Sequence, residues 1–450
     1  MELVTVKNYR CFREEQSARL APLTLLVGEN STGKTSFLAM VRALWQVSSE
    51  SLVPDFQQPP YDLGAFREIV HHTARNRGQS FEASFTRTIP QRRPSNIQRP
   101  PSELATFTVT FEPRDGFPYP TRRRLTSGNK VLEAGEDDIR LVVSGREARI
   151  PQRRTARLAD NRLPLLWSLV RRCMVGEAHE DPSDATSEQV SQVLTRKDIK
   201  QFVDLAEAFE QLRFIRNPRG ANSPFAGAPV RSTPKRTYDP ARPFQDPSGE
   251  YIPMLLANLS RRDPEGWSSL KRSLEAFGKD SGLFGEISIK SLGKTEASPF
   301  QLHVRISTGK SRGNKTNLID VGYGVSQALP ILTELLRKEQ APMFLLQQPE
   351  VHLHPTAQAA LGTLFCELAS WEKQVVVETH SDYILDRVRM DVRDKRTPLT
   401  ADDVSIVYFE ANGTDIKIHS LALDEAGNVQ DTPPSYRQFF MEETRRSIGI

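Results

Sequence analysis

A glycine-rich loop between an expected strand and an expected helix constrains this chain more than any other feature. Residues 28–35 read Gly-Glu-Asn-Ser-Thr-Gly-Lys-Thr, directly after the apolar run 23–27, and apolar residues recur at helical spacing over 37–44. This is the order of a phosphate-binding loop, in which backbone N–H groups converge on phosphate oxygens at a helix N-terminus. The motif predicts a nucleoside triphosphate site formed by Gly28, Asn30, Ser31, Thr32, Gly33, Lys34, Thr35 and Ser36.

Two residues of this loop carry the chemistry of the predicted site. The ammonium group of Lys34 is expected to reach the outer phosphates, and the hydroxyl of Thr35 is expected to bind Mg²⁺. ATP and Mg²⁺ are therefore the cofactors that the motif implies. The alternative is a glycine loop that precedes a helix by chance, but every fixed position of the motif is present.

Composition favours a cytoplasmic protein. The 450 residues are enough for two or three domains, and a net charge of +4 does not by itself indicate a nucleic-acid partner. The three cysteines lie far apart without Cys-x-x-Cys spacing, which argues against disulfides and against a zinc site. The sequence shows neither a signal peptide nor an apolar stretch of membrane-spanning length, so we expect no membrane contact.

The pattern of apolar residues predicts an α/β protein in three parts. Residues 1–150 contain the loop and a β-rich segment, in which the Pro- and Arg-rich stretch 119–124 is expected to be a connection. Residues 151–285 are expected to form a helical and proline-rich insertion, whose prolines argue against a long coiled coil. Residues 286–450 are expected to alternate helix and strand.

The individual elements follow from the same pattern. Helices are expected between 184 and 215 and at 324–337, 355–371 and 382–390. After residue 285, strands are expected at 286–291, 301–307, 343–347, 374–378, 404–409 and 415–418.

Three segments place polar residues where the second half of an ATP site is needed. The strands expected at 343–347 and 374–378 each end in polar residues, and a polar turn opens the helix expected at 324–337. Taken singly, each segment has a simpler explanation as a turn or a helix cap. The candidate residues of the three segments are Gly324, Ser326, Gln327, Gln347, Gln348, Glu350, Glu378 and His380.

In combination and order, these segments resemble the ABC-type ATPases, in the branch that contains RecF-like and OLD-like proteins. Residues 324–327 lie where the family has its signature motif, residues 345–350 where it has the Walker B motif, residues 352–355 at the D-loop, and His380 at the switch histidine. The resemblance implies an ABC-type P-loop ATPase head with a mixed β-sheet lobe and a helical, loop-rich insertion.

The resemblance also implies how ATP is used. Two heads of this family pair head to tail, so ATP would lie between Lys34 and Thr35 of one copy and Ser326 of the other. His380 would contact the terminal phosphate from the same chain as Lys34. A homodimer or a higher homo-oligomer with ATP at the interface is therefore expected.

One departure concerns the residues that bind the metal and activate water. The family carries carboxylates where this chain has Gln347 and Gln348, and an amide cannot accept a proton as a carboxylate does. Either Glu350 or Glu378 replaces the missing group, or the chain uses ATP as a clamp and hydrolyses it very slowly. We favour slow hydrolysis, with Thr35 and Gln347 as metal ligands and with Gln348, Glu350, Glu378 and His380 as candidate catalytic residues.

The biological role is inferred from the same resemblance. The residues after His380 show no carboxylate cluster of the TOPRIM type, so we do not expect nuclease activity within this chain. Its plan resembles the ATPase subunits of bacterial anti-phage systems such as PARIS and Septu. That resemblance implies a separate effector, a TOPRIM- or HNH-type nuclease, and a phage-encoded trigger protein.

Two other roles stay open. A RecF-like ATPase clamp in DNA repair or recombination would bind DNA through basic clusters at 122–124, 153–154, 171–172 and 235–236. Solvated loops of a charge-balanced chain contain such clusters as well. The third role is a regulatory scaffold that assembles into rings.

Overall fold

A computed structural model describes most of the chain outside the predicted insertion. The described residues are 1–50, 53–72, 80–90, 102–135, 138–151, 195, 198, 201, 223–240, 245–295, 297–308, 311–337, 341–413 and 415–436. The helices expected between 184 and 215 lie outside the described residues, apart from single positions. The division of the chain at residues 150 and 285 stays a prediction.

The chain forms two compact units that alternate along the sequence. Unit 1 comprises residues 1–20, 36–216 and 411–418. Unit 2 comprises residues 21–35, 217–410 and 419–450. Helix α1 (Lys34–Trp45) begins in unit 2 and continues in unit 1.

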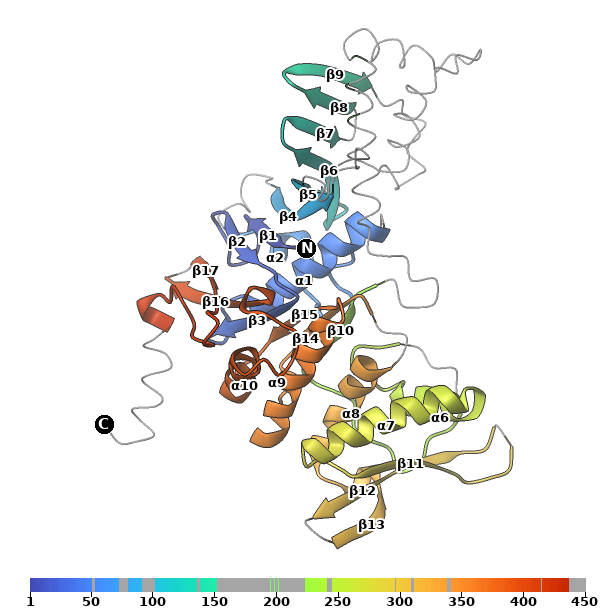
Figure 1. Ribbon diagram of the computed structural model, residues 1–450. Coiled ribbons are helices and arrows are strands. Elements are labelled where there is room, and N and C mark those ends of the chain that lie inside the picture. The colour runs from blue at the N-terminus through green and yellow to red at the C-terminus, as the bar shows by residue number, and fades with distance from the viewer. Residues whose placement is uncertain are drawn as a thin grey trace, which may run out of the picture. The chain divides into compact units, whose positions relative to one another are not determined.

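Unit 1 is built on an eight-stranded antiparallel sheet in the order β2-β1-β4-β5-β6-β7-β8-β9 (Figure 1). The strands are β1 (Leu3–Lys7), β2 (Gln16–Arg19), β4 (Phe81–Pro90), β5 (Ser102–Arg114), β6 (Phe117–Ser127), β7 (Lys130–Ala134), β8 (Asp138–Val143) and β9 (Arg146–Pro151). A π-helical turn (Gln46–Glu50) follows α1, and the short helix α2 (Phe66–Ile69) precedes β4.

Aromatic side chains form the core of unit 1. The rings of Phe81 on β4 and Phe111 on β5 stack with centroids 4.8 Å apart, and Phe56 meets both rings edge-on. Tyr9 lies 5.6 Å from Phe81. Apolar residues that alternate along β4 and β5 thus bury one face of the strands, as the period-two pattern predicts.

The prediction that residues 119–124 form a connection is wrong, because they lie within β6. The register between β5 and β6 shifts so that Thr110 pairs with Arg122 and Phe111 with Pro120, which leaves Thr121 without an opposite residue. A bulge of this kind accommodates proline, whose nitrogen cannot donate to a neighbouring strand. The sequence pattern did not reveal β6 because its prolines resemble those of a loop.

Unit 2 is built on a six-stranded sheet in the order β10-β14-β15-β3-β16-β17, whose first five strands run parallel (Figure 1). Its strands are β3 (Leu23–Gly28), β10 (Phe225–Gly227), β14 (Met343–Gln347), β15 (Gln374–Glu378), β16 (Val404–Asn412) and β17 (Asp415–Leu421). Residues 411–412 of β16 and 415–418 of β17 are assigned to unit 1. Every residue of β3 and β14 is buried, as continuous apolar runs in parallel sheets predict. The α/β class expected from the sequence is confirmed.

The register of the parallel strands aligns their carboxyl ends. Leu346 of β14 pairs with Val377 of β15, which pairs with Leu25 of β3. One residue later, Gln347 pairs with Glu378. Both strands therefore end in a polar side chain at one edge of the sheet, which is the edge where ligands bind in open α/β sheets.

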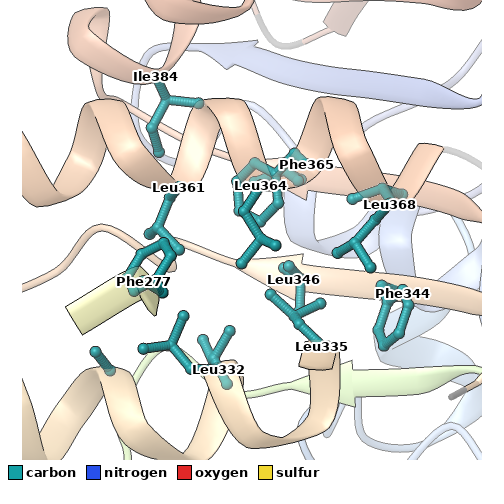
Figure 2. Packing of buried hydrophobic residues seen from close by; sticks show 14 of the residues in the cluster. Phe277, Leu332, Leu335, Phe344, Leu346, Leu361, Leu364, Phe365, Leu368 and Ile384 are labelled. Atoms are coloured by element: carbon teal, nitrogen blue, oxygen red, sulfur yellow. The ribbon is translucent and has the colours of Figure 1, made fainter. Parts of the chain in front are cut away.

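Helices of unit 2 pack on the sheet through a continuous apolar core. Figure 2 shows Leu364 and Phe365 of α9 gathered with Leu335 of α8 and with Phe344 of β14. The helices predicted at 324–337, 355–371 and 382–390 are confirmed as α8 (Tyr323–Leu336), α9 (Pro355–Ser370) and α10 (Asp382–Arg393).

A small antiparallel sheet completes the description of unit 2. It consists of β11 (Glu286–Ser291), β12 (Phe300–Thr308) and β13 (Ser311–Asn317), after helices α6 (Ile252–Arg262) and α7 (Pro264–Asp280). Short 3-10 turns lie at Leu318–Asp320 and Ala401–Asp403. The longest helix within the described ranges is α7, with 17 residues. No helix in these ranges is long and apolar enough to cross a membrane.

Phe365→Ala is expected to destabilise unit 2, because the side chain is 0% exposed in the core of Figure 2. Truncation of a buried aromatic residue costs about 3–5 kcal/mol of unfolding free energy. Trp371, the C-cap of the same helix, is 55% exposed. Trp371→Ala is therefore the matched control, with an expected change below about 0.5 kcal/mol. Urea unfolding measures both variants, and equal losses would contradict this packing.

Candidate functional site

The phosphate-binding loop has a backbone that requires glycine. Gly28 has a φ of 138° and Gly33 a φ of 86°, values that side chains rarely permit. A Cβ atom at Gly28 would lie 2.5 Å from the carbonyl oxygen of Phe409 on β16. Ser31, at the tip of the loop, also has a positive φ, of 64°. The two glycines of the motif are thus needed to turn the chain from β3 into α1.

The remaining residues of the predicted loop differ in exposure. Asn30 and Ser31 are exposed, whereas Thr32 is buried and its hydroxyl donates to the carbonyl oxygen of Glu29 over 2.8 Å. Ser36, the first residue of unit 1 on this helix, is buried, and its carbonyl oxygen accepts from the Tyr9 hydroxyl over 2.8 Å. These contacts hold both ends of the loop in place.

The ammonium group of Lys34 is folded onto the loop. Its side chain is buried, and Nζ donates to the carbonyl oxygens of Gly28 over 3.0 Å and Glu29 over 2.6 Å. Burial lowers the pKa of Lys34, while the nearby carboxylates of Glu378 and Glu29 oppose this shift. Lys34 therefore lies where its charge can act on an anion held by the loop.

A carboxylate lies next to the hydroxyl expected to bind the metal. Thr35 donates to Oε2 of Glu378 over 2.8 Å. Glu378 is the last residue of β15 and is only 5% exposed. Burial raises the pKa of this carboxyl, and Thr35 and Lys34 oppose the shift. The structure thus brings Thr35, Lys34 and Glu378 together.

The two glutamines end the neighbouring strand. Gln347 is 4% exposed, and its amide nitrogen has no hydrogen-bond partner among the described residues. The backbone N–H of Gln348 donates to the carbonyl oxygen of Glu378 over 2.8 Å. The carboxylate that accepts a hydrogen bond from Thr35 is therefore that of Glu378, at the end of β15, and β14 ends in amides.

Glu350 and His380 are joined through the backbone. Oε1 of Glu350 accepts from the N–H of His380 over 2.8 Å, whereas Oε2 has no partner among the described residues. Burial raises the pKa of Glu350, with hydrogen bonds and Arg231 opposing the shift. Partial desolvation of the ring, and then the positive charge of Lys34, lower the pKa of His380. Both candidate catalytic residues therefore lie close to the loop.

The signature segment forms a separate cluster with the D-loop. A Cβ atom at Gly324 would lie 2.9 Å from the carbonyl oxygen of His352, and the ring of Tyr323 meets the His352 ring at 5.4 Å. Ser326 is 5% exposed, and its hydroxyl donates to the Tyr323 carbonyl over 3.0 Å. Gln327 is buried, and its amide nitrogen lacks a partner among the described residues. Within the described ranges, no hydrogen bond joins this cluster to the phosphate-binding loop.

One residue of the site was missed by sequence reasoning. Arg231 follows the three-residue strand β10 (Phe225–Gly227). The surrounding sequence is rich in Pro, Gly and Ser and did not indicate a strand. It is 4% exposed, and NH2 donates to the carbonyl oxygen of Gln348 over 3.2 Å. Burial lowers the pKa of Arg231 to about 10, and Glu350 opposes this shift. The only signal in the sequence was an arginine shortly after a brief apolar run.

The donor atoms around Thr35 suit a hard divalent cation. The Thr35 hydroxyl and the Glu378 carboxylate are joined by a hydrogen bond. Gln347, whose amide oxygen is a further donor atom, pairs with Glu378 across strands β14 and β15. Such a set fits Mg²⁺, which is bound in proteins through one or two carboxylates with substrate phosphates and water as further ligands. The described residues contain no cluster of three or more His, Cys, Asp or Glu side chains that could hold a metal.

Solved structures to which the chain is similar include heads of SMC proteins. They include an Smc head bound to the C-terminal winged-helix domain of ScpA, with 13% identity, a TM-score of 0.45, and coverage of 94% of this chain and 98% of that one. The Smc head of Pyrococcus furiosus has 12% identity, a TM-score of 0.40 and 99% coverage of both chains. The SMC head of Thermotoga maritima has 10% identity, a TM-score of 0.36, and coverage of 93% and 98%. A comparison with curated proteins found no match.

A family model matches the chain over residues 23–386 and is described as "AAA domain, putative AbiEii toxin, Type IV TA system". The matched range includes the phosphate-binding loop, the signature segment, both strand ends of the site and His380. By this match over most of its length, the chain belongs to the AAA-domain family of AbiEii-like P-loop ATPases.

Proposed function

We propose that the chain is an ATP-binding switch of the ABC type, which hydrolyses ATP slowly and pairs with a second copy around it. The contact that carries the proposal is the hydrogen bond from Thr35 to Glu378 beside the buried Lys34. It joins the loop that follows β3 to a carboxylate at the end of β15, which is the arrangement a nucleotide–metal complex needs.

The phosphates are proposed to occupy the space over the loop. Backbone N–H groups of the loop and the start of α1 would hold the phosphate oxygens. Lys34 would exchange its contacts with the Gly28 and Glu29 carbonyl oxygens for contacts with the outer phosphates. This exchange needs no large movement, because Nζ is already held at the base of the loop.

Thr35, Glu378 and the amide oxygen of Gln347 are proposed to hold Mg²⁺. The bound ion would neutralise charge on the phosphates. Glu378 supplies the carboxylate that Gln347 lacks, because it accepts from the Thr35 hydroxyl. That assignment leaves Glu350 as the carboxylate available to orient water or to accept its proton.

Slow turnover follows from the groups at the end of β14. Gln348 occupies the position of the usual catalytic carboxylate, and an amide orients water without removing a proton from it. One oxygen of Glu350 is already engaged by the N–H of His380. Glu350 is therefore a constrained base, and a bound nucleotide would persist long enough to hold an assembly together.

Pairing is proposed from the resemblance to ABC-type ATPases, whose heads pair head to tail. Ser326, with Gly324 and Gln327, would contact the terminal phosphate bound by the loop of a second copy. Tyr323 is 54% exposed beside this segment and would lie in the same interface. ATP binding and assembly would then be one event.

In biological terms, we propose an OLD-like or RecF-like ATPase of a bacterial defence module that controls a separate effector nuclease of the TOPRIM or HNH type. The description of the matched family, which names a putative toxin of a toxin–antitoxin system, supports a role of this kind. A phage-encoded protein would be the trigger. Copurification with a nuclease encoded next to this chain would test the role.

A RecF-like DNA clamp has less support. Arg122 and Arg124 both contact Glu133, and Lys235 contacts Glu250 over 2.7 Å. Paired charges of this kind offer less attraction to a phosphate backbone. The clusters at 153–154 and 171–172 lie outside the described residues. Salt-sensitive binding of bare DNA that ATP strengthens would favour the clamp.

Lys34→Ala is expected to abolish ATP binding, and Ser326→Arg is expected to retain binding but lose ATP-dependent pairing. The first change removes the ammonium group from the loop, and the second places a bulky cation where the partner copy would dock. Binding of a fluorescent ATP analogue and molecular mass with and without ATP measure the two effects. Unchanged ATP binding by Lys34→Ala would contradict the site assignment. A molecular mass of the wild-type protein that is the same with and without ATP would contradict the pairing.

Glu378→Gln is expected to reduce the gain in ATP affinity that Mg²⁺ provides by at least about tenfold. Glu350→Gln should keep this gain but lower turnover, because it leaves Thr35 and Glu378 in place. Titration of ATP with Mg²⁺ or EDTA, followed by a phosphate-release assay, separates the two roles. If both variants keep full turnover, neither carboxylate replaces the missing one.

ATP binding is expected to raise the pKa of His380, because a triphosphate adds negative charge beside a ring whose pKa Lys34 and partial desolvation keep below 6.5. The complex then takes up a proton, and ATP affinity rises as the pH falls through the window between the free and bound pKa values. Calorimetry in buffers of different ionisation enthalpy, repeated over a series of pH values, measures this uptake. His380→Gln should show less uptake than wild type; equal uptake would contradict the contact.

A further inference from the structure

Arg231 occupies the end of the sheet beside the Walker B segment. Strand β10 runs parallel to β14, and Gly227 pairs with Leu346. The chain therefore leaves β10 at the same edge of the sheet at which β14 ends. Four residues later, Arg231 donates from NH2 to the carbonyl oxygen of Gln348 over 3.2 Å.

The guanidinium group of Arg231 has more donors than the protein satisfies. The side chain is 4% exposed, yet Nε and NH1 have no hydrogen-bond partner among the described residues. A buried charge with unsatisfied donors is strongly unfavourable unless another group meets them. Gln348 is neutral, so the residue that accepts from Arg231 offers a backbone carbonyl and no opposite charge.

The groups around Arg231 connect it to the loop. The negative charge of Glu350 acts on Arg231, and Oε2 of Glu350 also lacks a hydrogen-bond partner among the described residues. The other oxygen of Glu350 accepts from the N–H of His380, and the charge of Lys34 acts on the His380 ring. Glu350 and His380 thus link Arg231 to the phosphate-binding lysine through a hydrogen bond and two charge interactions.

We propose that Arg231 recognises the terminal phosphate of ATP and so distinguishes a triphosphate from a diphosphate. This inference deepens the proposed function and rests on nucleotide binding by the loop. A planar guanidinium group with two donor nitrogens, Nε and NH1, that lack partners among the described residues matches the oxygens of a phosphate group better than a point charge does. When the terminal phosphate is absent, the carbonyl of Gln348 and the charge of Glu350 hold the arginine in place.

The test compares a fluorescent ADP with a fluorescent β,γ-imido analogue of ATP, bound to the full chain with Mg²⁺. Arg231→Gln should weaken the ATP analogue by at least about tenfold and change ADP affinity by less than about twofold. Arg231→Lys keeps the positive charge but lacks the planar guanidinium group. This variant should lose part of the preference for the ATP analogue over ADP. Arg262→Gln, at an exposed arginine at the end of α6, is the matched control and should change neither affinity.

Two results would overturn the inference. If Arg231→Gln weakens both nucleotides equally, or neither, the arginine is only a structural partner of Glu350. If Arg231→Gln does not fold, the variant that also carries Glu350→Gln is compared with Glu350→Gln alone, and the same loss of discrimination is expected. Lys34→Ala separates this inference from the proposed function, because its loss of both nucleotides supports the site whatever Arg231 does.

Discussion

The parallel register of β14, β15 and β3 is the constraint on which the candidate site depends. It pairs Gln347 with Glu378 and places both beside the loop that follows β3. The hydrogen bond from Thr35 to Glu378 exists only because these strands end at the same edge. A shift of one residue in either pairing would turn the polar strand ends to the opposite face of the sheet. The apolar core in Figure 2 holds this register, since it packs α8 and α9 on the strands.

Four buried charges lie around the strand ends, and their signs balance. The first two opposite charges are Lys34 and Glu378, each of which opposes the pKa shift of the other, and the second two are Arg231 and Glu350. Removing one member of such a pair leaves a buried charge without compensation. The protein keeps this arrangement although apolar residues would pack more favourably there. We propose that this arrangement serves to bind a polyanionic ligand, which needs positive charge and unsatisfied hydrogen-bond donors.

Sequence patterns predicted the elements whose residues determine their own conformation. The loop from Gly28 to Thr35 and helices α8, α9 and α10 follow from glycine positions and helical periodicity, which are local properties. Patterns failed for β6, where prolines lie at a bulge, and for β10, whose three residues are too few for any period. Arg231 was missed with β10, because its significance depends on a neighbouring strand more than a hundred residues later in the sequence.

The sequence by itself determined that the chain has a phosphate-binding loop, an α/β fold and glutamines at 347 and 348, because each is a property of consecutive residues. Only the tertiary structure decided which carboxylate stands beside Thr35. Both Glu350 and Glu378 were candidates, and strand pairing places Glu378 there while Glu350 turns to the backbone of His380. The tertiary structure also brought Arg231 to the site. Such choices depend on register and burial, which arise when distant segments pack and which no local pattern records.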